Sequence, residues 1–142
     1  MTVQLCKSFA LECFTGTHDL STDVIKVALF DSSASFDEDT TAYSTTNELA
    51  TGNGYTTGGA TATPTSGYPA LSTAGAECRF DTVSWTFTDN KALKWALFYN
   101  SSKADRAILS IDIGARTVTG AFNITFPLTL DALLDLRIKV SA

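Results

Sequence analysis

The chain has 142 residues, of which 44% are hydrophobic and 18% charged, and its net charge is −5 with a pI near 4.6. A chain of this length suits one domain, residues 1–142, which can bury about two-thirds of the surface that its unfolded form exposes. The acidic balance disfavours nucleic acid as a partner because phosphates would be repelled, and no apolar run approaches the roughly 20 residues of a membrane span.

The three cysteines, Cys6, Cys13 and Cys78, are odd in number and fit no zinc-ligand spacing. They therefore predict small apolar core residues in a reducing compartment, rather than disulfides. The N-terminus has no continuous apolar run with a cleavage site, so we expect no secretory signal. These features favour synthesis in a cytoplasm.

The first expected element is a short amphipathic helix over residues 2–15. Gly16 stands where a helix C-terminal cap belongs. Apolar residues recur in this stretch at helical spacing: Val3, Cys6, Phe9 or Ala10, and Cys13.

The next element is "DVIKVALF", residues 23–30, a nearly unbroken apolar run of strand length. Polar residues follow it in "DSSASFDEDTT". Such a run between polar segments is typical of a central, largely buried strand.

Residues 40–75 are rich in Thr, Gly, Ala and Ser and carry hardly any charge. A segment this long without a core of its own is usually functional or docked, so we predict a long loop or an extended arm. Within it, "GNGYTTGG" (52–59) looks like a phosphate-binding loop, but Thr57 stands where a dinucleotide fingerprint has its third glycine. The prolines that follow cannot open a helix. We therefore interpret the glycines as positive-φ loop positions, with Tyr55 packed down as an anchor.

The second half of the chain alternates apolar and polar residues with the two-residue period of strands. A hairpin loop is expected at "SSKAD" (101–105). Together with residues 23–30, the pattern gives seven or eight short strands and one leading helix. That number predicts an all-β fold, an antiparallel β-sandwich or jelly-roll-like barrel. The expected strands lie in residues 77–81, 82–87, 92–100, 106–114, 117–126 and 133–140.

Candidates for catalysis are few. His18 is the only histidine, and its place in "GTHDL" beside Asp19 predicts a capping or turn role rather than a catalytic triad. The run "DEDTT" (37–41) lacks the alternating ligands and glycine of a calcium loop, so we interpret it as a solvated acidic loop.

Two further constellations give no site. Asp112, Asp131 and Asp135 offer carboxylates for glycosidic chemistry, but strand alternation favours solvent-facing positions for them. Clustered aromatic residues suggest a sugar groove or, more simply, a core: Trp85, Phe87, Trp95, Phe98 and Tyr99. We predict no catalytic, cofactor-binding or metal-ligating residue and no cofactor, and an enzyme is the least favoured class.

Residues 8–63 resemble the start of a family of small virion structural proteins from tailed bacteriophages. The shared signature runs from a short helix through G-x-H-D, an F/I-K-V-A-L-Y/F strand, T-x-A-Y, N-E and G-x-G-Y-x-x-G-G. The segments "FDTVSWTF", "ALKWALFYNSSKADRAILSIDIG" and "FNITFP" look like the later strands of the family, whereas "PTSGYPALSTAGAECR" (64–79) departs from it. In this chain the signature elements are Gly16, His18 and Asp19, residues 25–30, Ala42 and Tyr43, Asn47 and Glu48, and Gly54, Tyr55, Gly58 and Gly59.

The resemblance implies a non-enzymatic particle component, made in the host cytoplasm and assembled in many copies in the virion. A capsid decoration or cement protein that binds the major capsid protein is favoured, as a homo-oligomer. A trimer is favoured over a dimer because capsid lattices have threefold positions. The alternative is a tail, neck or fibre-tip component, for which Tyr55 or Tyr68 would be exposed contacts with the host surface. Neither nucleic acid nor a membrane is expected as a partner.

Overall fold

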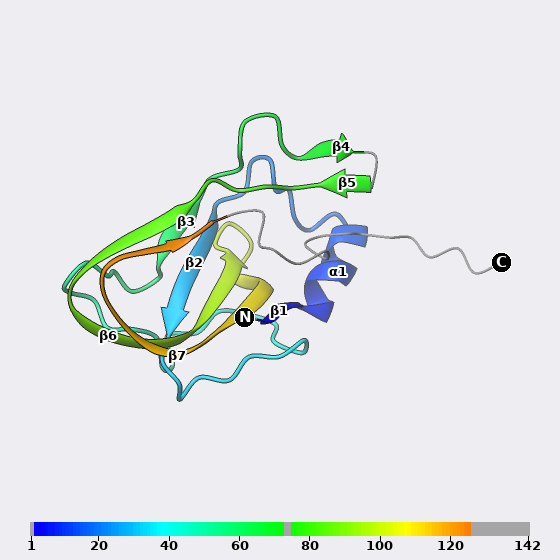
Figure 1. Cartoon of the computed structure of the whole chain (residues 1–142). Coiled ribbons are helices and arrows are strands. Elements are labelled where there is room, and N and C mark those ends of the chain that lie inside the picture. Colours follow the sequence, from blue (N-terminus) through cyan, green and yellow to red (C-terminus); the bar gives the residue numbers. More distant parts are fainter. Residues whose placement is uncertain (1, 73–74, 126–142) are drawn as a thin grey trace.

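A computed structural model describes residues 2–72 and 75–125 (Figure 1). Every strand pairing within those residues is antiparallel, and strands far outweigh the one short helix, which confirms the all-β prediction. No helix in this part of the chain is long and apolar enough to cross a membrane. The elements in chain order are β1 (Thr2–Leu5), α1 (Lys7–Phe14), β2 (Ile25–Phe30), β3 (Ala60–Ala62), β4 (Ala70–Ser72), β5 (Gly75–Glu77), β6 (Val83–Asn100) and β7 (Arg106–Ile124).

The main sheet has five strands in the order β1-β7-β6-β2-β3, and β4 and β5 form a separate two-stranded sheet. The long hairpin of β6 and β7 dominates the fold and curls around the core (Figure 1). Its turn is the predicted loop at residues 101–105. The described pairings place β1 and β3 at the two edges and do not close the sheet into a barrel.

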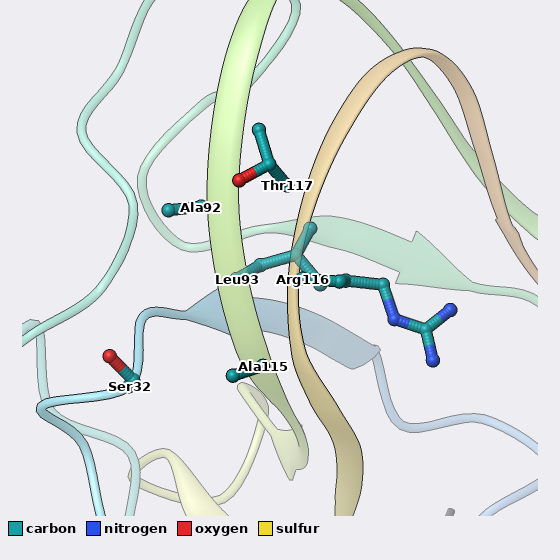
Figure 2. A pocket seen from close by; sticks show the side chains of 6 residues that line it. All are labelled: Ser32, Ala92, Leu93, Ala115, Arg116 and Thr117. Carbon is teal, nitrogen blue, oxygen red and sulfur yellow. The ribbon is translucent and has the colours of Figure 1, made fainter.

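The continuous course of β6 and β7 corrects the sequence analysis, which divided each into two short strands. The register shifts between Phe87 and Lys91, and again between Leu93 and Trp95. Such bulges bend a hairpin while most of its backbone pairing continues. The bend is formed by consecutive polar residues, 88–91, which look like a turn in the sequence. Nevertheless, Leu93 beside them still pairs with Arg116 (Figure 2).

The first residues also differ from the prediction, because the expected helix over residues 2–15 begins only at Lys7. Thr2–Leu5 is instead an edge strand that pairs with β7. Val3 and Leu5 pack against the core from this strand. Cys6 marks the change to helix: its backbone is extended, and its N–H donates to the carbonyl of Ile108 at 2.9 Å. The helical spacing in the sequence starts at Val3, but its next member, Cys6, already lies outside β1.

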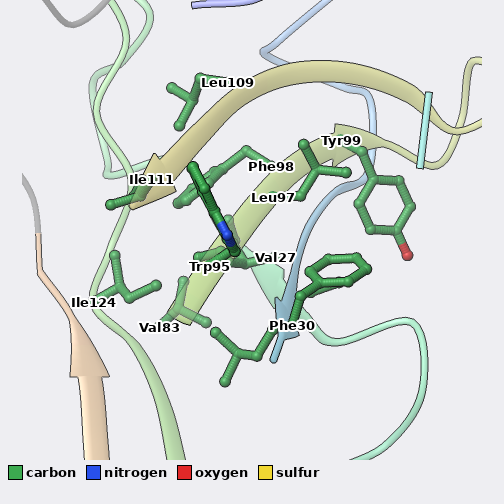
Figure 3. Packing of buried hydrophobic residues seen from close by; sticks show 14 of the residues in the cluster. Val27, Phe30, Val83, Trp95, Leu97, Phe98, Tyr99, Leu109, Ile111 and Ile124 are labelled. Atoms are coloured by element: carbon green, nitrogen blue, oxygen red, sulfur yellow. The ribbon is translucent and has the colours of Figure 1, made fainter. Parts of the chain in front are cut away.

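The core fills the concave side of the curled sheet (Figure 3). β2 lies between β3 and β6 and is buried along nearly its whole length, as the sequence predicts for residues 23–30. Aromatic rings contact one another around Phe36, which lies 4.8 Å from Phe30 and 5.8 Å from Trp95 between ring centroids. The five aromatic residues predicted as core are all buried: Trp85, Phe87, Trp95, Phe98 and Tyr99.

Residues 63–81 form a ribbon, here called the arm, that projects from the main sheet and ends in β4 and β5 (Figure 1). Backbone hydrogen bonds join its two sides: Asp81 N–H donates to Thr63 at 2.9 Å, and Thr65 N–H donates to Arg79 at 2.9 Å. The predicted strand over residues 77–81 is therefore part of this ribbon. The predicted strand over residues 133–140 lies outside the described residues.

Truncation of one core side chain should measure how much the curled sheet depends on its packing. Leu97 is fully buried, so we expect Leu97→Ala to lower the free energy of unfolding by about 2–5 kcal/mol, measured by urea denaturation. Ser84→Ala, at an exposed position of the same strand, should change it by less than about 0.5 kcal/mol. Equal effects of the two substitutions would contradict the described core.

Candidate functional site

The carboxylate of Glu48 binds three residues of the middle segment: Tyr43, Tyr55 and Gly58. It accepts hydrogen bonds from the Tyr43 hydroxyl at 2.6 Å and the Tyr55 hydroxyl at 2.7 Å. It also accepts the N–H of Gly58 at 2.7 Å. One side chain thereby joins three points of a long loop that has little regular secondary structure.

Two tyrosines connect this loop to the sheet. The Tyr55 hydroxyl accepts the N–H of Leu29 in β2 at 2.9 Å, and its side chain is buried. Tyr99 of β6 donates its hydroxyl to the carbonyl of Gly58 at 2.7 Å. The ring of Tyr43 stacks on Tyr99, with centroids 4.3 Å apart. The prediction that Tyr55 anchors the loop is therefore confirmed.

The phenols in this cluster are donors rather than anions. Burial, together with the negative charges of Asp105 and Glu48, raises the pKa of Tyr99 to about 12. Burial also raises the pKa of Tyr55 well above its ordinary value, and Glu48 adds to the rise against the opposing N–H of Leu29. Both hydroxyls therefore keep their protons at neutral pH, as their hydrogen bonds require.

The glycines of the loop allow close contact between backbones. A Cβ at Gly59 would lie 1.9 Å from the Val27 carbonyl oxygen, and a Cβ at Gly54 would lie 1.9 Å from that of Thr86. Both glycines have positive φ, at +73° and +93°, which confirms the interpretation of residues 52–59 as positive-φ positions. The loop amides are also occupied: Gly52 and Tyr55 bond each other and Gly59 bonds Thr56. These amides therefore do not converge on an anion.

A second buried network surrounds His18. Asn100 donates to Nδ1 of the ring at 2.9 Å, so Nε2 carries the proton and donates to Glu12 at 2.7 Å. The other oxygen of Glu12 pairs with Arg106. Asn100 also donates to Asp23 at 2.7 Å. The network joins α1, the connection that follows it and the β6–β7 turn.

The predicted capping or turn role of His18 is wrong, since its side chain is fully buried and bonded on both nitrogens. The neighbouring Asp19 takes the turn role instead and accepts the N–H of Ser21 at 3.0 Å. With both ring nitrogens engaged, the imidazole in this arrangement has no nitrogen left to activate a nucleophile. Sequence reasoning missed Asn100 because His18 is 82 residues away, and it missed Glu12 because its pairing with Arg106 spans 94 residues.

The acidic residues singled out in the sequence lie in different parts of the chain. Glu38 and Asp39 lie in an exposed loop and pair with Lys7 at 2.6 and 3.1 Å, which confirms the solvated loop over residues 37–41. Asp112 is partly buried and lies 3.8 Å from Lys94, whereas Asp131 and Asp135 lie outside the described residues. Among the residues that the structure describes, no three His, Cys, Asp or Glu side chains are close enough to share a metal ion.

The three cysteines are free thiols. Cys6 is fully buried, as predicted, while Cys13 and Cys78 are only partly buried. Burial raises the pKa of both Cys6 and Cys78 to about 11. These thiols are therefore protonated and weakly nucleophilic at neutral pH.

A shallow cavity of about 270 Å³ lies beside the bend of β6 and β7 (Figure 2). Its lining is mostly small, and its single charged group, the Arg116 guanidinium, donates to the carbonyl of Ile113. No pair of titratable groups converges in it. The lining residues are Ser32, Ala92, Leu93, Ala115, Arg116 and Thr117.

Several large apolar side chains are exposed on the surface rather than packed in the core. Leu71 in the arm is 89% exposed, and Leu11 and Phe14, one turn apart on α1, are 64% and 65% exposed. Tyr68, within the arm, is partly buried under the Arg79 guanidinium, whose central carbon lies 5.1 Å from the ring centroid. The expectation that Tyr55 is an exposed contact is wrong, because its ring is buried. The features that protrude for contact are thus the arm and one face of α1.

Comparison of the chain with protein-family models, curated proteins and solved structures gives no match.

Removal of the Glu48 carboxylate should release the loop. Glu48→Ala leaves two hydroxyls and one N–H without their acceptor, so we expect a loss of about 2–4 kcal/mol in the free energy of unfolding. Glu38→Ala removes a carboxylate whose ion pair is exposed and should cost less than about 1 kcal/mol. Urea denaturation measures both, and similar losses would contradict the role of Glu48.

The buried carboxylate of Asp23 should make the free energy of unfolding decrease at low pH. Burial raises the pKa of Asp23, but the Asp19 N–H, Asn100 and Lys103 outweigh it and hold the pKa below its usual value of 3.8. A lowered pKa stabilises the fold above the unfolded-state pKa, and that contribution disappears as the pH falls through the folded-state pKa. The free energy of unfolding should therefore decrease below about pH 4, and less steeply in Asp23→Asn.

The measurement is urea denaturation at a series of pH values. Asp39→Asn, which changes an exposed carboxylate, serves as the control. If Asp23→Asn and the wild type lose stability in parallel, Asp23 makes no such contribution.

Proposed function

We propose that the protein is a non-enzymatic virion structural component of a tailed bacteriophage, a capsid decoration or cement protein. It binds the shell of the major capsid protein and stabilises it at the capsid surface, after synthesis in the host cytoplasm. The resemblance of residues 8–63 supports this proposal. The signature residues take part in two networks that give the chain a rigid body, which suits a building block.

The observation that carries the proposal is the arm. A two-stranded ribbon is marginally stable in water by itself, and this one presents Leu71 almost fully exposed. Docking across a neighbouring subunit would bury that side chain and order the ribbon. Cement proteins act through many such modest contacts, because repeated copies on a lattice make weak interfaces effective.

The rest of the chain is suited to present the arm without moving. The loop around Glu48 and the connection through His18 are each tied to the sheet by several buried hydrogen bonds. A preordered body loses little conformational entropy on binding, so more of the contact energy appears as affinity.

The assembled unit we favour is a homotrimer, with a symmetric dimer as the alternative. The acidic surface fits a protein partner and not nucleic acid or a membrane. As part of the same proposal, the complete domain is a β-sandwich or a jelly-roll-like barrel.

Binding to particles that lack this protein tests the proposal. Wild-type protein should saturate the shell at hundreds of copies and raise the temperature at which the capsid opens. Leu71→Asp should weaken binding at least tenfold by placing a charge in the contact, because a buried charge without a partner is costly. Ser84→Asp, on the exposed face of β6, serves as the matched control and should bind normally.

The second candidate is a tail, neck or fibre-tip component that contacts the host surface. It is favoured by Tyr68 and Arg79, an aromatic ring and a guanidinium brought together on a projecting segment. Such pairs are common where proteins bind glycans or other proteins. Copy number on a stained gel separates the two: a few dozen copies or fewer, with labelled protein at the tail, would replace the cement proposal.

A further inference from the structure

The turn at residues 52–55 contains the one asparagine of the chain that precedes a glycine, Asn53. Gly52 and Tyr55 bond each other through their backbones, at 2.8 and 3.1 Å, so Asn53 and Gly54 are the two central residues of a hairpin turn. Both have positive φ, at +53° and +93°. Asparagine and glycine are favoured in such a turn because they adopt this conformation at low cost.

An asparagine followed by a glycine can lose its side-chain amide with water as the only other reactant. The backbone nitrogen of Gly54 attacks the side-chain carbonyl carbon of Asn53 and forms a five-membered imide, while ammonia leaves with the proton of that nitrogen. Water then opens the imide at one of its two carbonyl carbons and leaves aspartate or isoaspartate at position 53. Glycine favours the attack because it has no side chain to block the approach.

The fold leaves the nucleophile of this reaction accessible. Asn53 and Gly54 are both exposed, so water reaches the turn. Within residues 2–72 and 75–125, no acceptor binds the N–H of Gly54. The nitrogen that attacks therefore has no hydrogen bond within this part of the chain to lose beforehand.

One contact holds the side chain that is attacked. The amide of Asn53 donates to Oδ2 of Asp89, at the bend of β6, at 2.8 Å. The Asp89 side chain is 43% exposed, and its other oxygen lies 3.3 Å from the ammonium group of Lys91. An exposed contact of this kind opens at a low cost in free energy. The bond to Asp89 therefore delays the attack, and the turn becomes reactive whenever that bond opens.

We propose that Asn53 is a modification site, at which the folded chain deamidates spontaneously, and that Asp89 controls the rate. The product places a second carboxylate beside Asp89 and makes the net charge of −5 one unit more negative. Lys91 neutralises only one of the two carboxylates, and like charges at this distance repel each other. The turn is then loosened from the bend of β6. The N–H of Thr88, which donates to the Asn53 carbonyl at 3.1 Å, loses protection.

Mass spectrometry of the aged full chain tests the site. Wild-type protein is kept at mildly alkaline pH, and samples are digested in acid, which stops the reaction. We expect Asn53 to exchange its amide for a carboxylate about tenfold faster than the other asparagines, which precede larger residues. Equal rates would overturn the proposal, as would an unchanged Asn53 while a synthetic peptide of residues 51–56 reacts. The other asparagines are Asn47, Asn90, Asn100 and Asn123.

A matched pair of variants tests the control by Asp89. Asp89→Ala frees the Asn53 amide and should speed the reaction at Asn53 about threefold or more, because the turn then opens more often. Asp39→Ala removes an exposed carboxylate elsewhere and should leave the rate unchanged. An equal rate in the two variants would contradict the role of Asp89.

Hydrogen exchange measures the consequence of the modification. Asn53→Asp imitates the aspartate product and should speed exchange of the Thr88 amide about tenfold, as should ageing of the wild type. Asn123→Asp, which makes the same change of charge at an exposed position of β7, serves as the control and should leave that amide unchanged. Unaltered exchange in both Asn53→Asp and the aged protein would show that the turn stays in place, contrary to the proposal.

Discussion

Antiparallel pairing of β6 with β7 is the interaction on which the other elements depend. β2 is added to one side of this hairpin and β1 to the other, and the bend at its bulges creates the concave surface that the core fills. Next to the hairpin turn, two consecutive residues of β6 bind different parts of the chain. Tyr99 bonds the glycine loop and Asn100 bonds His18 and Asp23. Successive side chains of a strand point to opposite faces. Tyr99 therefore holds the glycine loop on one face of β6, and Asn100 holds the connection after α1 on the other face.

The two networks also explain why the family-like signature joins residues of such different chemistry. Glu48 and Tyr55 depend on each other, because a buried hydroxyl and a buried carboxylate each require a hydrogen-bond partner. Gly54 and Gly59 are needed because a side chain would collide with backbone atoms. None of these residues is left with a free group for chemistry on a ligand. Their shared effect is to hold a long irregular segment in one conformation against the sheet.

Local patterns in the sequence were sufficient for β2, for most of the residues of β6 and β7, for the core aromatic residues and for the glycine loop, because period, burial and positive φ are properties of neighbouring residues. They failed where the decisive contact is distant in the chain. Thr2–Leu5 is a strand because β7 lies beside it, although Val3 is also in helical spacing with Cys6. Polar residues at the bend resemble a turn until the bulge is seen. His18 needed Glu12 and Asn100, of which the second is 82 residues away.

The arm leaves the body at Thr63 and returns at Asp81, two residues joined by a backbone hydrogen bond of 2.9 Å. The two ends of the arm are therefore adjacent. The fold of the main sheet does not depend on the length or sequence of the arm between them. The part that departs from the resemblance, residues 64–79, is this same excursion. A change in the length or sequence of the arm therefore leaves the pairing of the main sheet and the packing of its core unaltered.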